Sequence, residues 1–212
     1  MRSPWAREYR RTPKRYIWGT EPSGFAGQVA AMLLPGARLL DLGCGEGRDS
    51  VFFAAQGLDV VGVDSSPAGI AKARRLAETR GVGVSWLVGD MARLTYQGLF
   101  DAVYSCGAVH YVPRARRARF FSRLQVLTRP GGLHAHVVFT DQEVYVEKGE
   151  IIDYFAPGEL AGFYGGWSIL QQKGGRIACD QDGTPHHHSV ESLIARAPAP
   201  GQSDVTGPSS KE

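Results

Sequence analysis

The chain has 212 residues, of which 43% are hydrophobic and 21% charged, and its formal net charge is +3. This length suits one globular domain with a substantial core. No apolar run approaches the ~20 residues of a membrane span, the amino terminus lacks the apolar core of a signal peptide, and three cysteines do not make a disulfide framework. We therefore expect a cytoplasmic protein without a membrane partner.

Residues 1–22 are predicted to form a basic arm or lid ahead of the domain of residues 23–197. The simplest interpretation of its charge is a solvated face, and the alternative is attraction of an anionic substrate. A nucleic-acid partner is not expected, because nucleic acid requires a more continuous basic surface. The basic residues are Arg2, Arg7, Arg10, Arg11, Lys14 and Arg15, against the single acid Glu8.

Short apolar runs then alternate with helical patterns. Ser23 can cap the first helix, and Pro67 and Gly81 mark the start and end of the third. A basic helix near residues 114–127 carries five arginines, also interpreted as a solvated face. This alternation is typical of a parallel sheet with helices on both faces. Helices are expected at about 25–34, 48–56, 67–80 and 114–127, and strands at 37–42, 59–63, 84–88, 100–105 and 133–139.

The last part of the domain follows another pattern. A short helix is expected at 158–164, then an apolar run at 167–170, a turn region at Gly174-Gly175 and a strand at 189–195. Two strands without a crossover helix pair antiparallel. We therefore predict a Rossmann-like α/β fold, with a seven-stranded, mostly parallel sheet that ends in an antiparallel hairpin. The tail, 198–212, has few apolar residues and is predicted to be disordered.

The most informative stretch is Leu39-Leu40-Asp41-Leu42-Gly43-Cys44-Gly45-Glu46-Gly47. Glycine lets a backbone turn tightly against a ligand, and the next helix points its amide-rich end into the space that remains. A second acid, Asp64, ends the next strand, where it can accept hydrogen bonds from a ribose diol. The spacing G-x-G-x-G differs from the G-x-G-x-x-G of NAD-binding proteins. The acids would repel a pyrophosphate, whereas they suit a cationic sulfonium.

This pattern, with Gly89-Asp90-Met91 after a third strand, resembles motif I and its partner motifs in the class I S-adenosylmethionine (SAM) methyltransferases. Ligands of such sheets lie beyond the carboxyl ends of the strands, near the switch point between the first and fourth. The expected cofactor contacts there are Asp41, Gly43, Cys44, Gly45 and Gly47 at the methionine part, Asp64 and Ser65 at the ribose, Asp90 and Met91 at the adenine, and Ser105 and Cys106 beside the sulfonium.

Candidate catalytic residues follow the fourth strand and precede the last one. His110 and Tyr111 are expected to face the acceptor, with a surface histidine and a packing tyrosine as the alternatives. The loop before the last strand carries Asp180, Asp182 and then His186-His187-His188. His186 and His188 would share one side of a strand. No metal is expected, because no acidic or Cys-x-x-Cys partner lies at ligand spacing. One of these histidines, with His186 as a candidate, is expected to line the acceptor pocket.

The wider chain resembles the TehB-like tellurite-resistance methyltransferases, which are related to the thiopurine methyltransferases. The resemblance implies methylation of a small soft nucleophile: a chalcogen oxyanion, a thiol or selenol, or a halide. It also implies that the segment with Tyr16 and Trp18 folds over the cofactor as a lid, and that Arg48 helps to hold either that segment or an anion. The matching segments are Tyr16–Pro22, Leu40–Ser50, Phe155–Leu160, Tyr164–Trp167 and Leu193–Arg196.

One departure concerns the last turn. TehB-type enzymes carry a histidine before it and an arginine after it, where this chain has about Ala178/Cys179 and Pro185/His186. A pre-ionised acceptor needs no base, whereas a hydroxyl or amine would need His110 or one of the three histidines. The alternatives are a natural-product O-, N- or S-methyltransferase and a SAM-binding protein without turnover. We expect a small-molecule acceptor and a monomer or homodimer.

Overall fold

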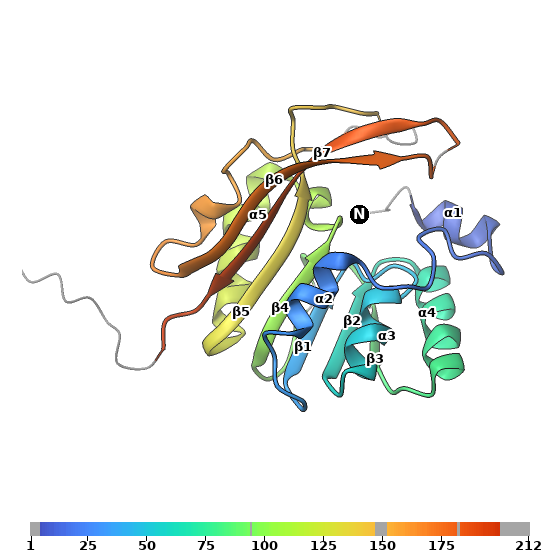
Figure 1. Ribbon diagram of the computed structural model, residues 1–212, viewed down its shortest axis with the longest axis horizontal. Coiled ribbons are helices and arrows are strands. Elements are labelled where there is room, and N and C mark those ends of the chain that lie inside the picture. Colours follow the sequence, from blue (N-terminus) through green and yellow to red (C-terminus); the bar gives the residue numbers. More distant parts are fainter. Residues whose placement is uncertain (1–4, 94, 147–151, 182, 200–212) are drawn as a thin grey trace, which may run out of the picture.

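The computed structural model describes residues 5–93, 95–146, 152–181 and 183–199. One seven-stranded sheet runs through the molecule in the order β3-β2-β1-β4-β5-β7-β6 (Figure 1). Strands β1 to β5 pair in parallel, and β5-β7-β6 pair antiparallel. The predicted mostly parallel sheet with a terminal hairpin is thereby confirmed. The strands are β1 (Arg38–Leu42), β2 (Asp59–Asp64), β3 (Ser85–Val88), β4 (Phe100–Cys106), β5 (Thr128–Phe139), β6 (Ser168–Cys179) and β7 (His186–Arg196).

Two of the helices, α2 and α4, begin at serine caps. The Ser23 side chain accepts a hydrogen bond from the amide of Ala26, and Ser66 accepts one from Gly69 ahead of Pro67. None of the helices in the described residues is long and apolar enough to cross a membrane. They are α1 (Trp5–Arg11), α2 (Gly24–Ala30), α3 (Arg48–Ala55), α4 (Pro67–Arg80) and α5 (Arg114–Val126), with 3₁₀ turns η1 (Val109–Tyr111) and η2 (Ala161–Phe163).

Alternate residues of the central strands build two cores, one on each face of the sheet. Leu40 and Leu42 of β1 pack with Phe121 and Leu124 of α5. Leu39, which directly precedes Leu40 in the strand, packs on the opposite face with residues of α2 and α3. Successive side chains of a strand point to opposite faces, so a strand buried on both sides is a continuous apolar run. The helices therefore cover both faces of the sheet and leave the ends of the strands accessible.

Three local expectations are wrong. Gly174 and Gly175 lie inside β6, paired with Glu191 and Val190, because the hairpin turns only after Cys179. The helix expected at 158–164 is reduced to the 3₁₀ turn η2. The helix expected at 25–34 is shorter than expected, because α2 ends at Ala30.

Arg117 does not belong to a solvated face. Its side chain is fully buried, with the guanidinium over the Phe155 ring at 3.7 Å and an ion pair to Glu159 at 2.9 Å. The other arginines of α5, at 114, 116, 119 and 123, are half-buried or exposed. Arg2, Asp182 and the tail from residue 200 lie outside the described residues.

Candidate functional site

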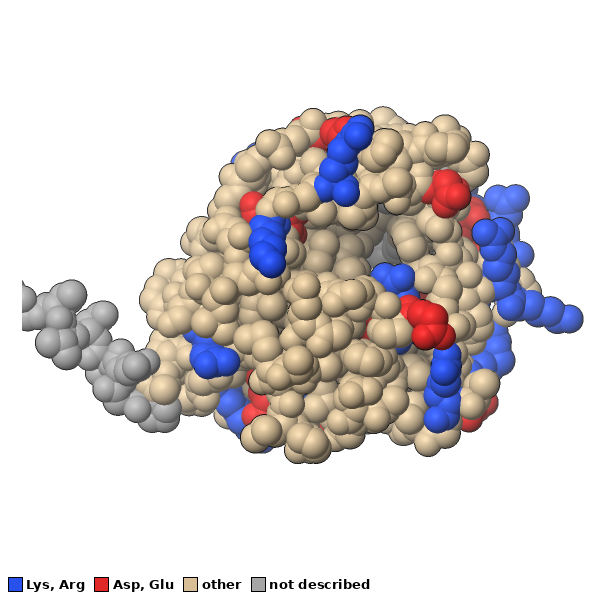
Figure 2. All heavy atoms as spheres, in the orientation of Figure 1, with Lys and Arg blue, Asp and Glu red and all other residues tan. Residues whose placement is uncertain are grey.

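A cavity of about 490 Å³ opens at the carboxyl ends of β1, β2, β4 and β5. Figure 2 shows this face hollowed between the β6–β7 hairpin and the α2 side of the molecule. The walls of the cavity come from α1, the glycine loop, the ends of the parallel strands, α5 and the β6–β7 hairpin. Of the predicted site residues, it is lined by Trp18, Gly43, Cys44, Gly45, Arg48, Asp64, Ser65, Asp90, Met91, Cys106 and Tyr111.

The glycine loop forms the floor of the cavity. The amides of Gly43 and Cys44 donate to the Val63 carbonyl at 2.8 and 2.9 Å, and the amide of Gly45 donates to the Asp64 carboxylate at 3.0 Å. Gly43 has φ +71°, and a Cβ there would lie 2.2 Å from that of Ala108. No residue with a side chain could take this position, because both its dihedral angle and its space exclude one.

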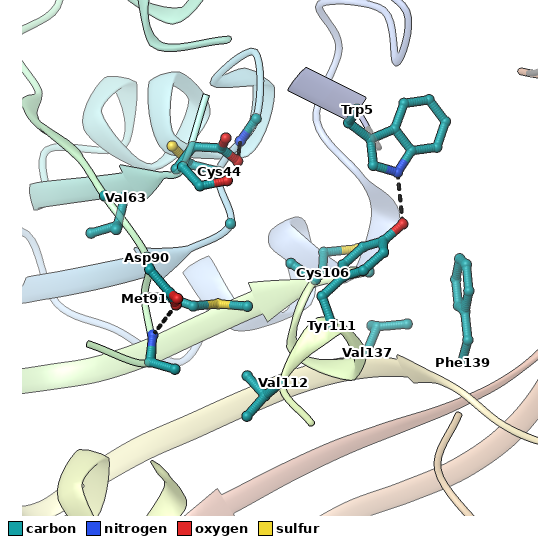
Figure 3. A pocket seen from close by; sticks show the side chains of 18 of the residues that line it. Trp5, Cys44, Val63, Asp90, Met91, Cys106, Tyr111, Val112, Val137 and Phe139 are labelled. Atoms are coloured by element: carbon teal, nitrogen blue, oxygen red, sulfur yellow. Dashed lines mark hydrogen bonds between the residues drawn. The ribbon is translucent and has the colours of Figure 1, made fainter. Parts of the chain in front are cut away.

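Two acids face the cavity at the ends of neighbouring strands. Asp64 accepts hydrogen bonds from the amides of Ser66 and Gly45, and its burial raises the pKa of the carboxyl. Asp90 accepts one from the amide of Ala92 at 2.9 Å and lies beside the Met91 thioether (Figure 3). Both carboxylates are held by backbone amides and keep further acceptor capacity. They can therefore accept hydrogen bonds from hydroxyl or amino groups of a ligand.

Asp41 lies behind the loop and does not line the cavity. Its carboxyl accepts a hydrogen bond from the Ser50 hydroxyl at 2.5 Å, and burial raises its pKa to about 8. Tyr16, Gly47 and Ser105 are also absent from the lining. Gly47 is the N-cap of α3, and the Tyr16 hydroxyl donates to the carbonyl of Lys72. The cofactor contacts expected of these residues therefore remain predictions, without a side chain in the wall.

The amino-terminal segment folds over the cavity and is anchored by residues of the glycine loop and of α4. The Glu46 carboxylate accepts the amides of Ile17 and Trp18 at 2.7 and 3.2 Å and pairs with Lys72, and both charged side chains are about 1% exposed. Arg48 donates to the Trp18 carbonyl at 3.0 Å. Trp18 in turn lies against Trp5, with ring centroids 4.8 Å apart. A buried ion pair thus fixes the segment that covers the site.

The far end of the cavity is aromatic and apolar. Tyr111, Phe139 and Ile177 line it, and the Trp5 indole donates to the Tyr111 hydroxyl at 2.7 Å across the mouth (Figure 3). Cys106 also faces the cavity, and burial raises the pKa of its thiol to about 11. Its sulfur is therefore a protonated thiol at neutral pH.

The two other candidate catalytic residues do not line the cavity. His110 is fully buried behind Phe139, their rings stacked at 4.3 Å, and desolvation lowers its pKa to about 3. His188 stacks on the same Phe139 at 4.1 Å, and its Nε2 lies 2.9 Å from that of His186. A catalytic role for His110 or His186 remains a prediction.

Sequence reasoning missed much of the aromatic wall and the lid anchor. Trp5 and Tyr9 lie one helical turn apart, which is a signal for a helix with one buried face. Glu46 stands inside the glycine motif, but its partner Lys72 follows 26 residues later on α4. Phe139 and Ile177 could not be found, because their approach depends on how the hairpin packs.

The sequence of this chain is similar to those of known methyltransferases. Residues 39–132 match the family profile described as a methyltransferase domain. Hemagglutinin 1 of Eikenella corrodens is 26% identical over 164 residues, which cover 76% of this chain and 55% of that protein. The probable S-adenosyl-L-methionine-dependent methyltransferase TehB of Haemophilus influenzae is 25% identical over 170 residues, covering 79% and 59%. This chain thus spans less than two thirds of the length of these relatives.

The crystal structure of TehB from Haemophilus influenzae has the same fold. It superposes with a TM-score of 0.75 at 23% identity and covers 90% of this chain and 67% of that chain. The glycine loop, Asp64 and Asp90 all lie within the matched segment, 39–132. By family profile, sequence and fold, the chain is similar to the TehB-like class I SAM-dependent methyltransferases.

Proposed function

We propose that this protein transfers a methyl group from SAM to a small soft nucleophile. When bound, SAM supplies a methyl carbon that is activated by a positive sulfur. The glycine loop would border its methionine part, Asp64 the ribose hydroxyls and Asp90 the adenine amino group. The residues fit such a cofactor, because hydrogen-bond acceptors stand at the nucleoside end and the aromatic faces of Trp5 and Tyr111 stand at the other. Aromatic faces attract a cationic group.

The observation that carries the acceptor class is the chemistry of the far wall. Around Tyr111, Phe139 and Ile177, the described lining holds neither a carboxylate nor a histidine. Its polar groups include the Cys106 thiol, the Tyr111 hydroxyl and the Trp5 indole N–H. Removing a proton from a hydroxyl or amine requires a base within hydrogen-bond reach. This wall therefore suits a nucleophile that is already ionised or needs no base.

Among soft nucleophiles, the wall favours a thiol or selenol with an apolar body over a hydrated oxyanion. Moving a charged, strongly hydrated group against apolar side chains costs free energy unless it is paired. Arg116, on the helix that follows Tyr111, is one of three arginines in the cavity lining, with Arg48 and Arg93, and it offers a positive charge there. A thiolate places one charge near that guanidinium and its hydrocarbon against Phe139. In-line transfer then depends on holding the sulfur ~3 Å from the methyl carbon.

The same wall supports a second candidate, the methylation of an apolar natural product at oxygen, nitrogen or sulfur. Phe139, Val137 and Ile177 offer apolar contact to a larger acceptor. We further propose that the acceptor is not a nucleic acid and that the protein acts as a monomer or homodimer in the cytoplasm.

The test begins with calorimetry of SAM and of its demethylated product. The SAM-bound protein is then given small thiols, a selenol, selenite, tellurite, iodide and matched alcohols and amines, and the demethylated product is measured. We expect micromolar cofactor binding and turnover of thiols or selenols above all others. Turnover of alcohols or amines alone would contradict the acceptor class. Failure to bind SAM would contradict the function itself.

A further inference from the structure

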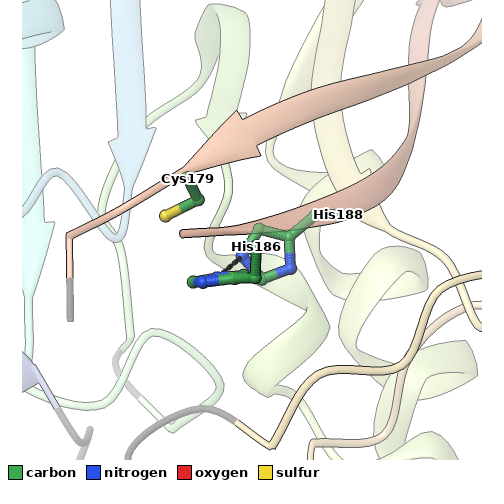
Figure 4. A group of neighbouring side chains, drawn as sticks. All are labelled: Cys179, His186 and His188. Carbon is green, nitrogen blue, oxygen red and sulfur yellow. Dashed lines mark hydrogen bonds between the residues drawn. The ribbon is translucent and has the colours of Figure 1, made fainter. Parts of the chain in front are cut away.

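The β6–β7 hairpin brings three metal-binding side chains to one face. Cys179 pairs directly with His186, and Ile177 pairs with His188. Directly opposed residues of an antiparallel pair point to the same side, and so do residues two apart in a strand. Ile177 lines the cavity, so this side of the hairpin is the one that faces the cavity. Figure 4 shows the three side chains extending from the two strands into one space.

The ligand atoms of this cluster converge. Cys179, His186 and His188 each offer one such atom, and all three atoms lie within 4.8 Å of one another. The Nε2 atoms of the two histidines are 2.9 Å apart. His186 Nδ1 lies 2.7 Å from the Thr184 carbonyl oxygen, which can only accept, so Nδ1 carries the hydrogen. In the neutral ring, Nε2 of His186 therefore presents its lone pair to the cluster.

Neighbouring groups orient the two histidine side chains, as outer-shell residues orient the ligands of a metal site. A hydrogen bond from the far nitrogen of a histidine to a backbone carbonyl fixes both tautomer and ring orientation. The His186 ring also stacks on Tyr145 at 3.5 Å with only 4° between the planes. His188 is buried and stacks on Phe139. The two imidazoles are therefore oriented before any ion arrives.

We propose that Cys179, His186 and His188 bind a borderline-soft divalent metal ion such as Zn²⁺. One thiolate and two neutral imidazoles are ligands that zinc prefers, whereas calcium and magnesium require oxygen. Three protein ligands leave a fourth tetrahedral position for water or another ligand. Phe139, which lines the cavity, stacks on His188 of the cluster. The site depends on the hairpin and not on the proposed methyl transfer.

The adjacent His187 provides a control that separates this site from a mere run of histidines. His187 is exposed, and as the middle residue of the three it points to the other side of β7. A run of histidines that captures metal non-specifically would need His187 as much as its neighbours. The proposed site requires His186 and Cys179 and does not use His187.

The experiment uses the full chain without an affinity tag, treated with chelator and then dialysed. Zn²⁺ is titrated by calorimetry and Co²⁺ by absorption, with Cys179→Ser, His186→Ala and His187→Ala beside the wild type. Circular dichroism checks that each variant is folded. Both substituted ligands are only half-buried, so the fold is expected to tolerate their loss.

The wild type and His187→Ala are expected to bind one ion and to show a thiolate-to-cobalt charge-transfer band. His186→Ala should weaken binding roughly a hundredfold or more, since losing an outer-shell partner alone costs about 10–100-fold. Cys179→Ser should abolish the charge-transfer band. Equal losses in His187→Ala and His186→Ala, or no stoichiometric binding by the wild type, would overturn the proposal.

Discussion

Replacing Glu46 by glutamine removes the charge that anchors the amino-terminal segment over the cavity. In the wild type, the carboxylate accepts the amides of Ile17 and Trp18 and pairs with Lys72. Glutamine can still accept those amides through its carbonyl oxygen. The ammonium of Lys72, however, is left inside the protein with the hydroxyl of Thr12 at 3.4 Å. The principal loss is therefore electrostatic.

The size of the effect follows from the burial of the pair, since both side chains are about 1% exposed. Removing one partner of a buried ion pair costs roughly 3–5 kcal/mol. For a chain of this length, 1 kcal/mol shifts the Tm by roughly 2–4 °C. Glu46→Gln should thus lower the Tm by roughly 6–20 °C. The double variant Glu46→Gln/Lys72→Met carries no unpaired charge and should recover most of that loss.

Thermal unfolding of Glu46→Gln, Lys72→Met and the double variant, followed by circular dichroism, measures these changes in Tm directly. Calorimetry with SAM should show weaker binding in Glu46→Gln, because Trp18 is then less firmly held over the cavity. The reasoning is refuted if the single and double variants lose the same stability, since the charge left on Lys72 would then cost nothing.

Three further predictions concern the cofactor, the lid and pH. Asp64→Ala should weaken SAM binding by roughly 10–100-fold through the loss of charge-assisted hydrogen bonds, while Asp59→Ala, at the exposed start of the same strand, should leave the calorimetric Kd unchanged. Tyr111→Phe removes the acceptor of the Trp5 bond and should weaken SAM binding by roughly 2–10-fold; an unchanged Kd would separate Trp5 from lid closure. Burial lowers the pKa of His136 to about 3, so the folded protein binds fewer protons than the unfolded chain between pH about 3 and about 6.5. The contribution of neutral His136 to stability is present above that pH window and is lost as pH falls through it. His136→Phe should therefore raise the Tm more at pH 5 than at pH 8. Equal gains in Tm at the two pH values would contradict the linkage.

The elements that the sequence predicted well are those whose signals are local. Ser23 and Ser66 cap helices with their own side chains, and the turn of the glycine loop depends on neighbouring residues. The pairing of the parallel strands follows largely from connections that contain a helix: α3 between β1 and β2, α4 between β2 and β3, and α5 between β4 and β5. The acids Asp64 and Asp90 were found because they end strands, and parallel strands end at one edge of the sheet.

What the sequence did not predict depends on distant contacts. Whether Asp41 faces the cavity or turns back to Ser50 is decided by the packing of α3 on β1. The approach of Cys179 to His186 depends on hairpin register, and glycines within β6 suggested an earlier turn. An edge strand such as β6, which pairs on one side only, tolerates such glycines, because it has fewer cross-strand side chains to pack. A ligand cluster formed across a strand pair leaves no fixed spacing in the sequence.

The cavity wall joins Trp5, near one end of the chain, to Ile177 of the terminal hairpin. During synthesis, residues 39–132 emerge with the glycine loop and both acids that line the cavity, Asp64 and Asp90, but β7 must still arrive between β5 and β6 before the hairpin can join the sheet. The nascent protein thus carries the acidic end of the cavity well before the aromatic end can close. Folding order, as well as the lid, therefore delays the completed site until the hairpin has docked.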